Sequence, residues 1–465
     1  MLNTIVKEPH QKELFGHPVG LFILFFTEMW ERFSYYGMRA ILVLYLVAKT
    51  SENNAGLGWT NAEALALYGW YTMLVYISSI PGGWIADKFI GQKKSVFIGG
   101  LLLVVGHSIL AVEQMLAFYT GLGFIIAGVG MLKPNISTMV GGLYKRGDIR
   151  RDKGFTIFYI GINIGAFLSS LIVGTIGEVY GWHYGFGLAG IGMALGLLQY
   201  VFGQKYLKNV GNFLGASTKI EEKEIANRSL SKIEKDRVIV LFISFLIVIV
   251  FWGAYEQAGG LMNIYASEKT NRILPFSLPF IGNEIPASWF QSLVALFIII
   301  LGTSVAGYWA KRKLQGKLST SLFKMLIGLV FMGTGYFFMS AAAGQNLTTG
   351  SSAMYWLVLT YLFHTIGELC VSPVALSYIT KLAPVKYASL MMGIYFAMTG
   401  IGNKVAGLIG ESASKLGEFT VFTGIAIISI IFGFLVMLFR NKLEVLTHGA
   451  EDDEHEMSND ELLKN

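Results

Sequence analysis

Charged residues are scarce in this sequence. Aspartate, glutamate, lysine and arginine make up only 14% of the 465 residues, whereas hydrophobic residues make up 54%. A typical soluble domain carries about 25% charged residues. A soluble globule of this composition would therefore expose large apolar patches to water. The shortage of charge excludes a soluble enzyme, a disordered protein and a nucleic-acid-binding module, and it indicates an integral membrane protein.

Cysteine and metal-ligand clusters are equally sparse. Cys370 is the single cysteine, so an intrachain disulfide is impossible. His364 and Glu368 have the spacing of two ligands on one helix, but nothing completes a ligand set, and we expect no metal. The glycines of Gly128-Val129-Gly130 are not followed by the Lys-Ser/Thr pair of a phosphate-binding loop. We therefore expect no nucleotide cofactor.

Twelve apolar segments are long enough to cross a bilayer, which takes about 20 residues. Because a backbone in lipid must satisfy its own hydrogen bonds, we expect each segment to be helical. The first begins near Val19, and it is too long for the core of a signal peptide. The predicted segments are 17–48, 60–87, 93–112, 114–144, 153–178, 184–203, 237–267, 285–310, 319–343, 353–382, 385–413 and 418–440.

The distribution of lysine and arginine orients these segments. With the N-terminus in the cytoplasm, 28 of the 36 basic residues fall on the cytoplasmic side, four on the opposite side and four inside predicted spans. Such an excess on one side is the positive-inside signal of membrane proteins. It predicts that both termini are cytoplasmic, and it explains the net charge of +6 without nucleic acid.

A polar stretch rich in lysine and glutamate divides the spans into two sets of six. Two six-helix bundles around a central site are a common transporter architecture. The acidic end of the chain lacks aromatic residues and is expected to be disordered. The predicted organisation is a cytoplasmic N-terminus at 1–16, a bundle at 17–203, a cytoplasmic linker at 204–236, a second bundle at 237–440 and a tail at 441–465.

Four charged side chains lie in the first predicted span: Glu28, Glu31, Arg32 and Arg39. Offsets of three and four residues place them on one stripe of a helix. A charge at the centre of a membrane helix costs about 2.5–3.5 kcal/mol on insertion scales. We therefore expect these side chains to face a water-filled cavity and to pair with one another.

Three more charges lie in other predicted spans, namely Lys133, Glu256 and Glu368. Buried ions pair because an uncompensated charge is costly. Protonating a buried carboxylate releases its base to seek another anion, which makes a proton-sensitive switch. The carboxylate of a substrate can then take the base, and its amine can take a glutamate. The charges thus predict a proton-coupled carrier for a small molecule that bears both charges.

Four motifs resemble those of the proton-dependent oligopeptide transporter family, within the major facilitator superfamily. They occur in the order expected, and the resemblance runs from about Phe15 to Arg440. The motifs are Glu28-Met29-Trp30-Glu31-Arg32-Phe33, the segment from Gly82 to Gly91, the segment from Phe158 to Gly165, and Gly367-Glu368-Leu369-Cys370-Val371-Ser372-Pro373.

The resemblance implies a role for each charged residue. Glu28, Glu31 and Arg32 would form a proton-coupling cluster, together with Glu256, which would also pair with Arg39 in a gate. Arg39 and Lys133 would hold the carboxylate of a peptide, and Glu368 would hold its amino terminus. The other implied substrate-binding residues are Tyr35, Tyr36, Tyr71, Asn163, Trp252, Ser372 and Tyr395.

The implied activity is proton-coupled import of di- and tripeptides by alternating access. The compact loops and the lack of a long extracellular insertion predict a bacterial inner membrane. The resemblance implies twelve transmembrane helices in the major facilitator fold, a monomer surrounded by lipid, and no cofactor apart from the coupling proton. The charged stretch at 204–236 is too short and polar for the two extra helices that many bacterial members carry between the bundles.

Two departures from the family pattern leave an alternative open. Val294 and Ala295 replace an Asn-Pro pair that usually follows Trp289-Phe290-Gln291-Ser292-Leu293, and Tyr395 replaces a common tryptophan. Because the missing asparagine normally helps to hold the amino end of the peptide, a carrier of another small zwitterion or anion, such as an amino acid derivative or nitrate, is the alternative. Lys404 is a further charge in a span, and Glu411 lies two turns away.

Two other classes of membrane protein fit the sequence poorly. A membrane-embedded enzyme needs a nucleophile–base pair or a metal set within its spans, and the pattern provides neither. A channel is built from rings of like charge or a filter loop, whereas the charges of this chain have mixed sign and lie on different segments.

Overall fold

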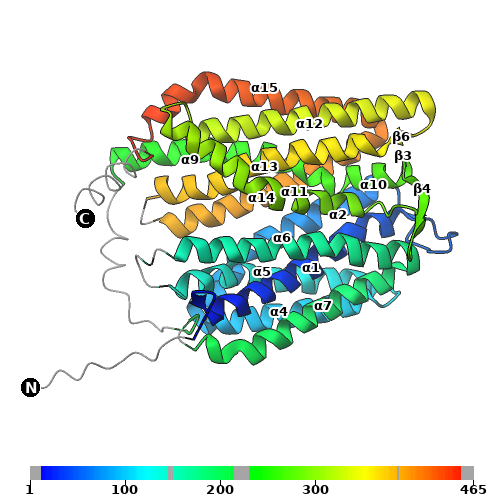
Figure 1. Cartoon of the computed structure of the whole chain (residues 1–465), viewed down its shortest axis with the longest axis horizontal. Coiled ribbons are helices and arrows are strands. Elements are labelled where there is room, and N and C mark those ends of the chain that lie inside the picture. Colours follow the sequence, from blue (N-terminus) through cyan, green and yellow to red (C-terminus); the bar gives the residue numbers. More distant parts are fainter. Residues whose placement is uncertain are drawn as a thin grey trace, which may run out of the picture. The chain divides into compact units, whose positions relative to one another are not determined.

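Long helices dominate the computed structural model, which describes residues 12–144, 148, 150–208, 210–213, 230–384 and 387–451 (Figure 1). The central part of the predicted linker, residues 214–229, and the end of the predicted tail, residues 452–465, lie outside the described residues. The prediction of an all-α protein is confirmed, because the strands are limited to short pairs.

The helices of the first half begin after a small hairpin made of β1 and β2. They are α1 Val19–Val47, α2 Asn61–Ile77, α3 Ser79–Ile85, α4 Gln92–Leu110, α5 Met115–Gly142, α6 Arg151–Thr175 and α7 Trp182–Gly203. Short helical turns extend three of them, at η1 Ala86–Ile90, η2 Ile176–Tyr180 and η3 Gln204–Tyr206. The hairpin strands are β1 Glu13–Leu14 and β2 His17–Pro18.

The helices of the second half follow the same plan. They are α9 Lys232–Tyr255, α10 Leu261–Glu268, α11 Trp289–Leu314, α12 Ser321–Thr349, α13 Met354–Leu382, α14 Ala388–Leu416 and α15 Glu418–Val445. The turn η4 Glu256–Ala258 joins α9 to α10. Two small sheets flank these helices, one pairing β3 Thr270–Asn271 with β6 Ser352–Ala353, the other pairing β4 Ile273–Leu278 with β5 Gly282–Glu284.

Each apolar segment predicted from the sequence overlaps one helix or a consecutive pair. Within the described residues, nine helices are long and apolar enough to cross a membrane. The predicted spans outside these nine are α1, which carries four charges, the pair α2–α3, and α14, which carries Lys404 and Glu411. This architecture is that of a multi-pass membrane protein. The last helix continues to Val445, beyond the predicted end at residue 440.

The contacts divide the chain into two compact units. Unit 1 comprises residues 1–38, 78–169 and 183–215, and unit 2 comprises 39–77, 170–182 and 216–465. The division passes through α1 after Met38 and through α6 after Ser169. Unit 2 therefore holds the ends of α1 and α6 and the whole of α2, in addition to all the helices from α9 onward.

Glycines bring the helices of unit 1 into backbone contact. Helix α4 packs on α5, and α3 packs on α5. A Cβ atom added at Gly82 of α3 would lie 2.1 Å from the carbonyl oxygen of Gly130 in α5. Such a distance is impossible for a real side chain, so this crossing depends on a residue without a Cβ atom. Gly99 and Gly128 meet in the same way where α4 crosses α5.

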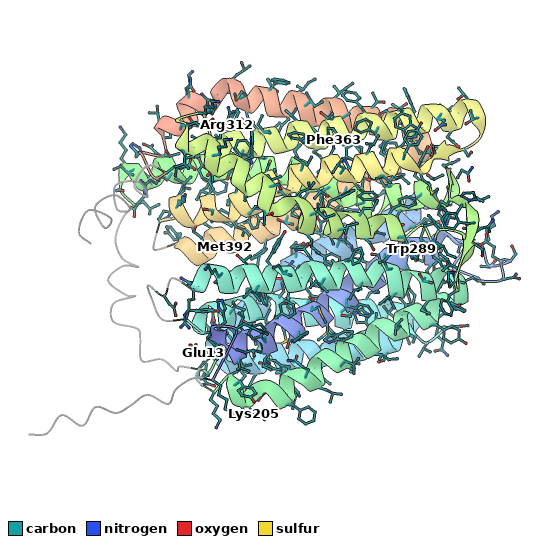
Figure 2. The ribbon with its side chains drawn as sticks, in the orientation of Figure 1. Glu13, Lys205, Trp289, Arg312, Phe363 and Met392 are labelled. Carbon is teal, nitrogen blue, oxygen red and sulfur yellow. The ribbon has the colours of Figure 1, made fainter. Side chains whose placement is uncertain are left out.

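Polar contacts tie residues 39–77 and 170–182 to the second half of the chain within unit 2. Asn263 of α10 donates to the carbonyl oxygen of Ala40 at 2.8 Å. The Glu178 carboxylate accepts the backbone N–H groups of Ala287 and Ser288 at 2.7 and 2.9 Å. Trp289, at the start of α11 (Figure 2), donates from Nε1 to Thr175 Oγ1 at 2.8 Å.

The close crossing at Gly82 leads to a stability prediction. We expect Gly82→Ala to lower the melting temperature of the purified protein, because overpacking a rigid contact costs about 1–3 kcal/mol. Gly123→Ala is the matched control, since a Cβ atom added at Gly123 would have no atom of another described helix or loop within 4 Å. Thermal unfolding in detergent checks the pair. Equal melting temperatures for the two variants would contradict the close contact.

Candidate functional site

The charged stripe of α1 contains a buried ion-paired cluster within unit 1. Arg32 Nε donates to Glu28 Oε1 at 2.8 Å, one helical turn away, and lies 2.7 Å from Glu31 Oε2. The three side chains expose at most 4% of their surface. Because two carboxylates share one guanidinium, the cluster contains one more negative than positive charge.

Lys133 of α5 interacts electrostatically with Glu31 and adds a second base to Arg32 at this cluster. Within the described residues, Glu28 Oε2 and Glu31 Oε1 have no hydrogen-bond partner. Two carboxylates and two bases are neutral together when all are ionised. Protonating either carboxylate would leave a net positive charge that favours the binding of an anion.

The close approach of α6 to α1 at this cluster depends on a glycine. A Cβ atom added at Gly165 would lie 2.2 Å from the carbonyl oxygen of Met29 and 3.0 Å from Cβ of Arg32. Gly165 belongs to the third motif recognised in the sequence. The motif therefore has a packing role beside Arg32. Asn163, two residues earlier, is buried and donates to the carbonyl oxygen of Tyr159 at 2.9 Å.

A second charged cluster lies in unit 2, where α1, α2 and η4 meet. Arg39 Nη1 donates to both carboxylate oxygens of Glu256, at 3.0 and 3.1 Å. Tyr68 of α2 donates its hydroxyl to Glu256 Oε2 at 3.0 Å. The Glu256 side chain exposes only 2% of its surface. A single carboxylate thus holds two side chains from the first half of the chain.

Glu256 stands at a break between α9 and α10. The helical pattern is interrupted at η4 and at Gly260, which has φ −105° and ψ −110°. Gln257 Nε2 donates to the carbonyl oxygen of Ala406 on α14 at 2.9 Å. The hydroxyl of Tyr336 donates to the carbonyl oxygen of Ala254 at 2.6 Å, and that of Tyr361 donates to Ala258 at 3.4 Å. Side chains thus satisfy carbonyl groups at the break.

Glu368 of α13 is close to this second cluster. The hydroxyl of Tyr255 donates to Glu368 Oε2 at 2.5 Å. Glu368 also interacts electrostatically with Arg39 and Glu256, all within unit 2. The half-buried carboxylate thus has a hydroxyl donor and a nearby guanidinium group within unit 2.

The aromatic and polar residues implied by the family resemblance divide between the units. In unit 1 the guanidinium carbon of Arg32 lies 6.0 Å from the ring centre of Tyr35 and 5.7 Å from that of Tyr36. In unit 2 the ring of Trp252 packs edge-on against Tyr255, with 5.0 Å between centroids. Tyr71 and Tyr395 are buried in unit 2, and the hydroxyl of Ser372 has no hydrogen-bond partner among the described residues.

Tyr68 and Tyr255 are the partners that sequence reasoning missed. Each donates a hydroxyl to a predicted glutamate, but a tyrosine in an apolar segment carries no sign of its partner. The one feature of the sequence that singles out Tyr255 is that it directly precedes Glu256, a predicted site residue. Lys404 has an ion-pair partner, since its Nζ lies 3.6 Å from Glu411 Oε1. It also lies 4.8 Å from the ring centre of Trp70.

Among the described residues, no group of three or more histidine, cysteine, aspartate or glutamate side chains could hold a metal ion. His364, four residues before Glu368, instead packs its ring 4.6 Å from the ring of Tyr336. In both clusters, the contacts between charged groups are ion pairs between side chains.

Comparison with known proteins yields matches along nearly the whole chain. The signature described as PTR2, POT family, matches residues 93–220 and 212–422. A Bacillus subtilis (strain 168) protein described as uncharacterized transporter YclF is 38% identical, over 94% of this chain and 96% of its own. A di-/tripeptide transporter of Lactococcus lactis subsp. cremoris is 37% identical, over 93% of this chain and 97% of its own.

A solved structure has the same fold. The crystal structure of a mutant of peptide transporter POT in complex with alafosfalin superposes with a TM-score of 0.84 and 35% identity, covering 94% of this chain and 97% of that chain. The relationship predicted from four sequence motifs is thus confirmed. On the family match and on relatives that align over almost their whole length, this chain belongs to the POT family.

Proposed function

We propose that this protein is a proton-coupled symporter that imports di- and tripeptides by alternating access. The observation that carries the proposal is the buried cluster of Glu28, Glu31 and Arg32 on α1. Membership of the POT family supports transport, and the identity with a di-/tripeptide transporter supports peptides as substrate. An enzymatic activity has no support of this kind.

The proposed topology has twelve spans in two six-helix bundles, with both termini in the cytoplasm of a bacterium. It rests on the overlap of every predicted segment with helix and on the excess of basic residues on one side. In this orientation the inward proton gradient drives uptake. Each proton that crosses a potential of 100 mV supplies about 2.3 kcal/mol. The protein would act as a monomer, without a cofactor.

Protons would enter the cycle at Glu28 and Glu31. Both carboxylates depend on Arg32, and Lys133 compensates the second negative charge. A proton on Glu31 would leave Arg32 paired with Glu28, and the two glutamates, Arg32 and Lys133 would together carry a net positive charge. A peptide carboxylate can balance that charge. Proton binding and substrate binding would thus favour each other, which is the requirement for symport.

Peptide binding would also loosen the second cluster. Arg39 is held by Glu256, so a peptide carboxylate at Arg39 competes with the contact between α1 and η4. The peptide ammonium group would take Glu368 in place of the Tyr255 hydroxyl. Both exchanges weaken contacts within unit 2 in response to substrate. The proposed lining residues around the peptide are Tyr35, Tyr36, Tyr71, Asn163, Trp252, Ser372 and Tyr395.

A second candidate function is transport of another small zwitterion or anion. Val294 on α11 has no polar atom in its side chain, where the family pattern has an asparagine that helps to hold the amino end of a peptide. Competition of labelled dipeptide uptake by free amino acids and by nitrate separates the two candidates. Stronger competition by either than by a tripeptide would favour the second.

Uptake into proteoliposomes tests the proposal and the role of Glu31. Acidifying the outside should drive accumulation of labelled dipeptide by the wild-type protein. Glu31→Gln should reduce this accumulation at least about tenfold, because the change removes a proton site, while peptide exchange without a gradient persists. Glu113→Gln, at an exposed position, is the control. Normal accumulation by the Glu31 variant would remove Glu31 from coupling.

Because Lys133 is proposed to bind the carboxylate of the peptide, the affinity for peptides should depend on that group. Lys133→Ala should weaken binding of a free dipeptide by about tenfold or more, since a buried ion pair loses one partner. Binding of the C-terminally amidated dipeptide should change far less. Competition binding with both peptides measures the difference, and Lys88→Ala at an exposed position is the control. Equal losses for the two peptides would argue against carboxylate capture.

Because Glu368 is proposed to bind the ammonium group of the peptide, uptake should depend on a free amino terminus. Glu368→Ala should lower uptake of a dipeptide with a free amino terminus several-fold, because the ammonium group loses its acceptor. Tyr255→Phe keeps the carboxylate and removes only its hydroxyl partner, so uptake should fall less. Unchanged uptake by Glu368→Ala would place the amine site elsewhere.

A further inference from the structure

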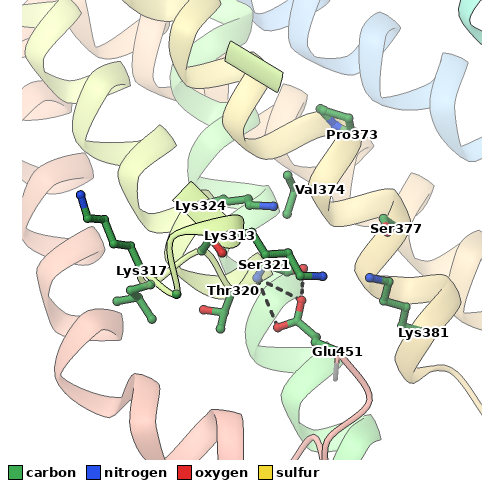
Figure 3. A pocket seen from close by; sticks show the side chains of 13 residues that line it. Lys313, Lys317, Thr320, Ser321, Lys324, Pro373, Val374, Ser377, Lys381 and Glu451 are labelled. Atoms are coloured by element: carbon green, nitrogen blue, oxygen red, sulfur yellow. Dashed lines mark hydrogen bonds between the residues drawn. The ribbon is translucent and has the colours of Figure 1, made fainter. Parts of the chain in front are cut away.

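A pocket with a volume of about 680 Å³ lies at the start of α12 in unit 2 (Figure 3). Its walls come from the loop between α11 and α12, the first turn of α12, the second half of α13 and the residue Glu451 after α15. Lysines and hydroxyl groups dominate the lining. The polar lining residues are Lys313, Lys317, Ser319, Thr320, Ser321, Lys324, Ser377, Lys381 and Glu451.

The start of α12 already binds an anion of the chain itself. The backbone N–H of Ser321 donates to both carboxylate oxygens of Glu451, at 3.0 and 3.2 Å, and the Ser321 hydroxyl also donates to Oε1. Glu451 lies 130 residues away in sequence. The N–H groups at a helix start carry partial positive charge and attract anions. The carboxylate therefore marks the position of an anion-binding centre.

Among the described residues, positive charge exceeds negative charge around this centre. Four lysines line the pocket, against the carboxylates of Glu451 and of Glu444 on α15, whose Oε1 accepts from the Thr320 hydroxyl at 2.6 Å. Figure 3 shows the side chains of Lys313, Lys324 and Lys381 around Ser321 and Glu451. Lys324 interacts electrostatically with Glu451 and with the other two lysines. Like charges held together repel, and an anion of higher charge relieves the repulsion.

We propose that this pocket binds a phosphate group and that Glu451 occupies its place in the described state. A phosphate offers several acceptor oxygens, enough for the Ser321 N–H, the Ser321 hydroxyl and the lysine amines together. The volume also accommodates a group larger than phosphate itself. The phosphate belongs either to the headgroup of an anionic lipid or to a free ion, and both would compete with Glu451.

The location of the pocket is compatible with both sources of the phosphate group, an anionic lipid and a free ion. The four lysines are among the 28 basic residues that the sequence predicts on the cytoplasmic side. Basic pockets between membrane helices on that side bind anionic headgroups. The site does not include any residue of the two proton and substrate clusters. Its occupancy is therefore a property separate from peptide recognition.

Binding to the purified full-length protein tests the proposal. One arm titrates inorganic phosphate by calorimetry in detergent. The other measures, by native mass spectrometry, the retention of phosphatidylglycerol relative to phosphatidylcholine. Whichever probe the wild-type protein binds, the double variant Lys324→Gln, Lys381→Gln should bind it roughly 30-fold more weakly, at about fivefold for each basic residue. Glu451→Gln should tighten it several-fold, because a competing carboxylate is removed.

The controls separate binding from folding. Lys311→Gln removes an exposed lysine of α11 outside the pocket and should leave binding unchanged. Lys313→Gln with Lys317→Gln alters only exposed positions, so it reports on the pocket even if the first double variant fails to fold. Lysine-dependent phosphate binding identifies a free ion, and lysine-dependent lipid retention alone identifies a headgroup. The proposal would be overturned if the lysine variants bound both probes as tightly as the wild-type protein does. It would also be overturned if Glu451→Gln bound them more weakly than the wild-type protein.

Discussion

The cost of placing charge in a membrane constrains this structure more than any other factor. An unpaired charge at the centre of a bilayer costs several kcal/mol, and α1 carries four charged residues between Glu28 and Arg39. The chain meets this constraint by pairing. Arg32 takes two carboxylates of its own helix, and Arg39 takes Glu256 from a distant part of the sequence. The same pairs are suited to exchange partners with a proton or a charged substrate.

The two arginines of α1 illustrate two ways of using a buried pair. Arg32 and its glutamates lie on one helix, so a movement of one helix against another does not separate them. Arg39 and Glu256 join separate elements, and Tyr68 adds a third element to the same carboxylate. Breaking the contacts of Arg32 changes the charge balance on α1. Breaking the contacts of Glu256 removes the bonds that join α1 and α2 to η4. A symporter needs both kinds of event, and it needs them coupled.

Much of this organisation was predictable from the sequence because charge and hydropathy are local properties. The twelve apolar segments, the pairing of Glu28 with Arg32 one turn later, and the family itself follow from residues close together in the chain. The hydroxyl partners Tyr68 and Tyr255 could not be predicted, because their choice depends on how helices pack. The interruption at η4 also escaped prediction. Its residues, Glu256 to Ala258, contain neither proline nor glycine, and glycines appear only at 259 and 260.

The interruption between α9 and α10 has a consequence for the backbone. An unbroken helix satisfies its own carbonyl groups, whereas a break leaves some of them to other donors. Here the carbonyl oxygens of Ala254 and Ala258 accept from the hydroxyls of Tyr336 and Tyr361. Residues on α12 and α13 therefore complete the hydrogen bonding of the segment that carries Glu256, so the carboxylate bound to Arg39 stands on backbone held by three helices instead of one.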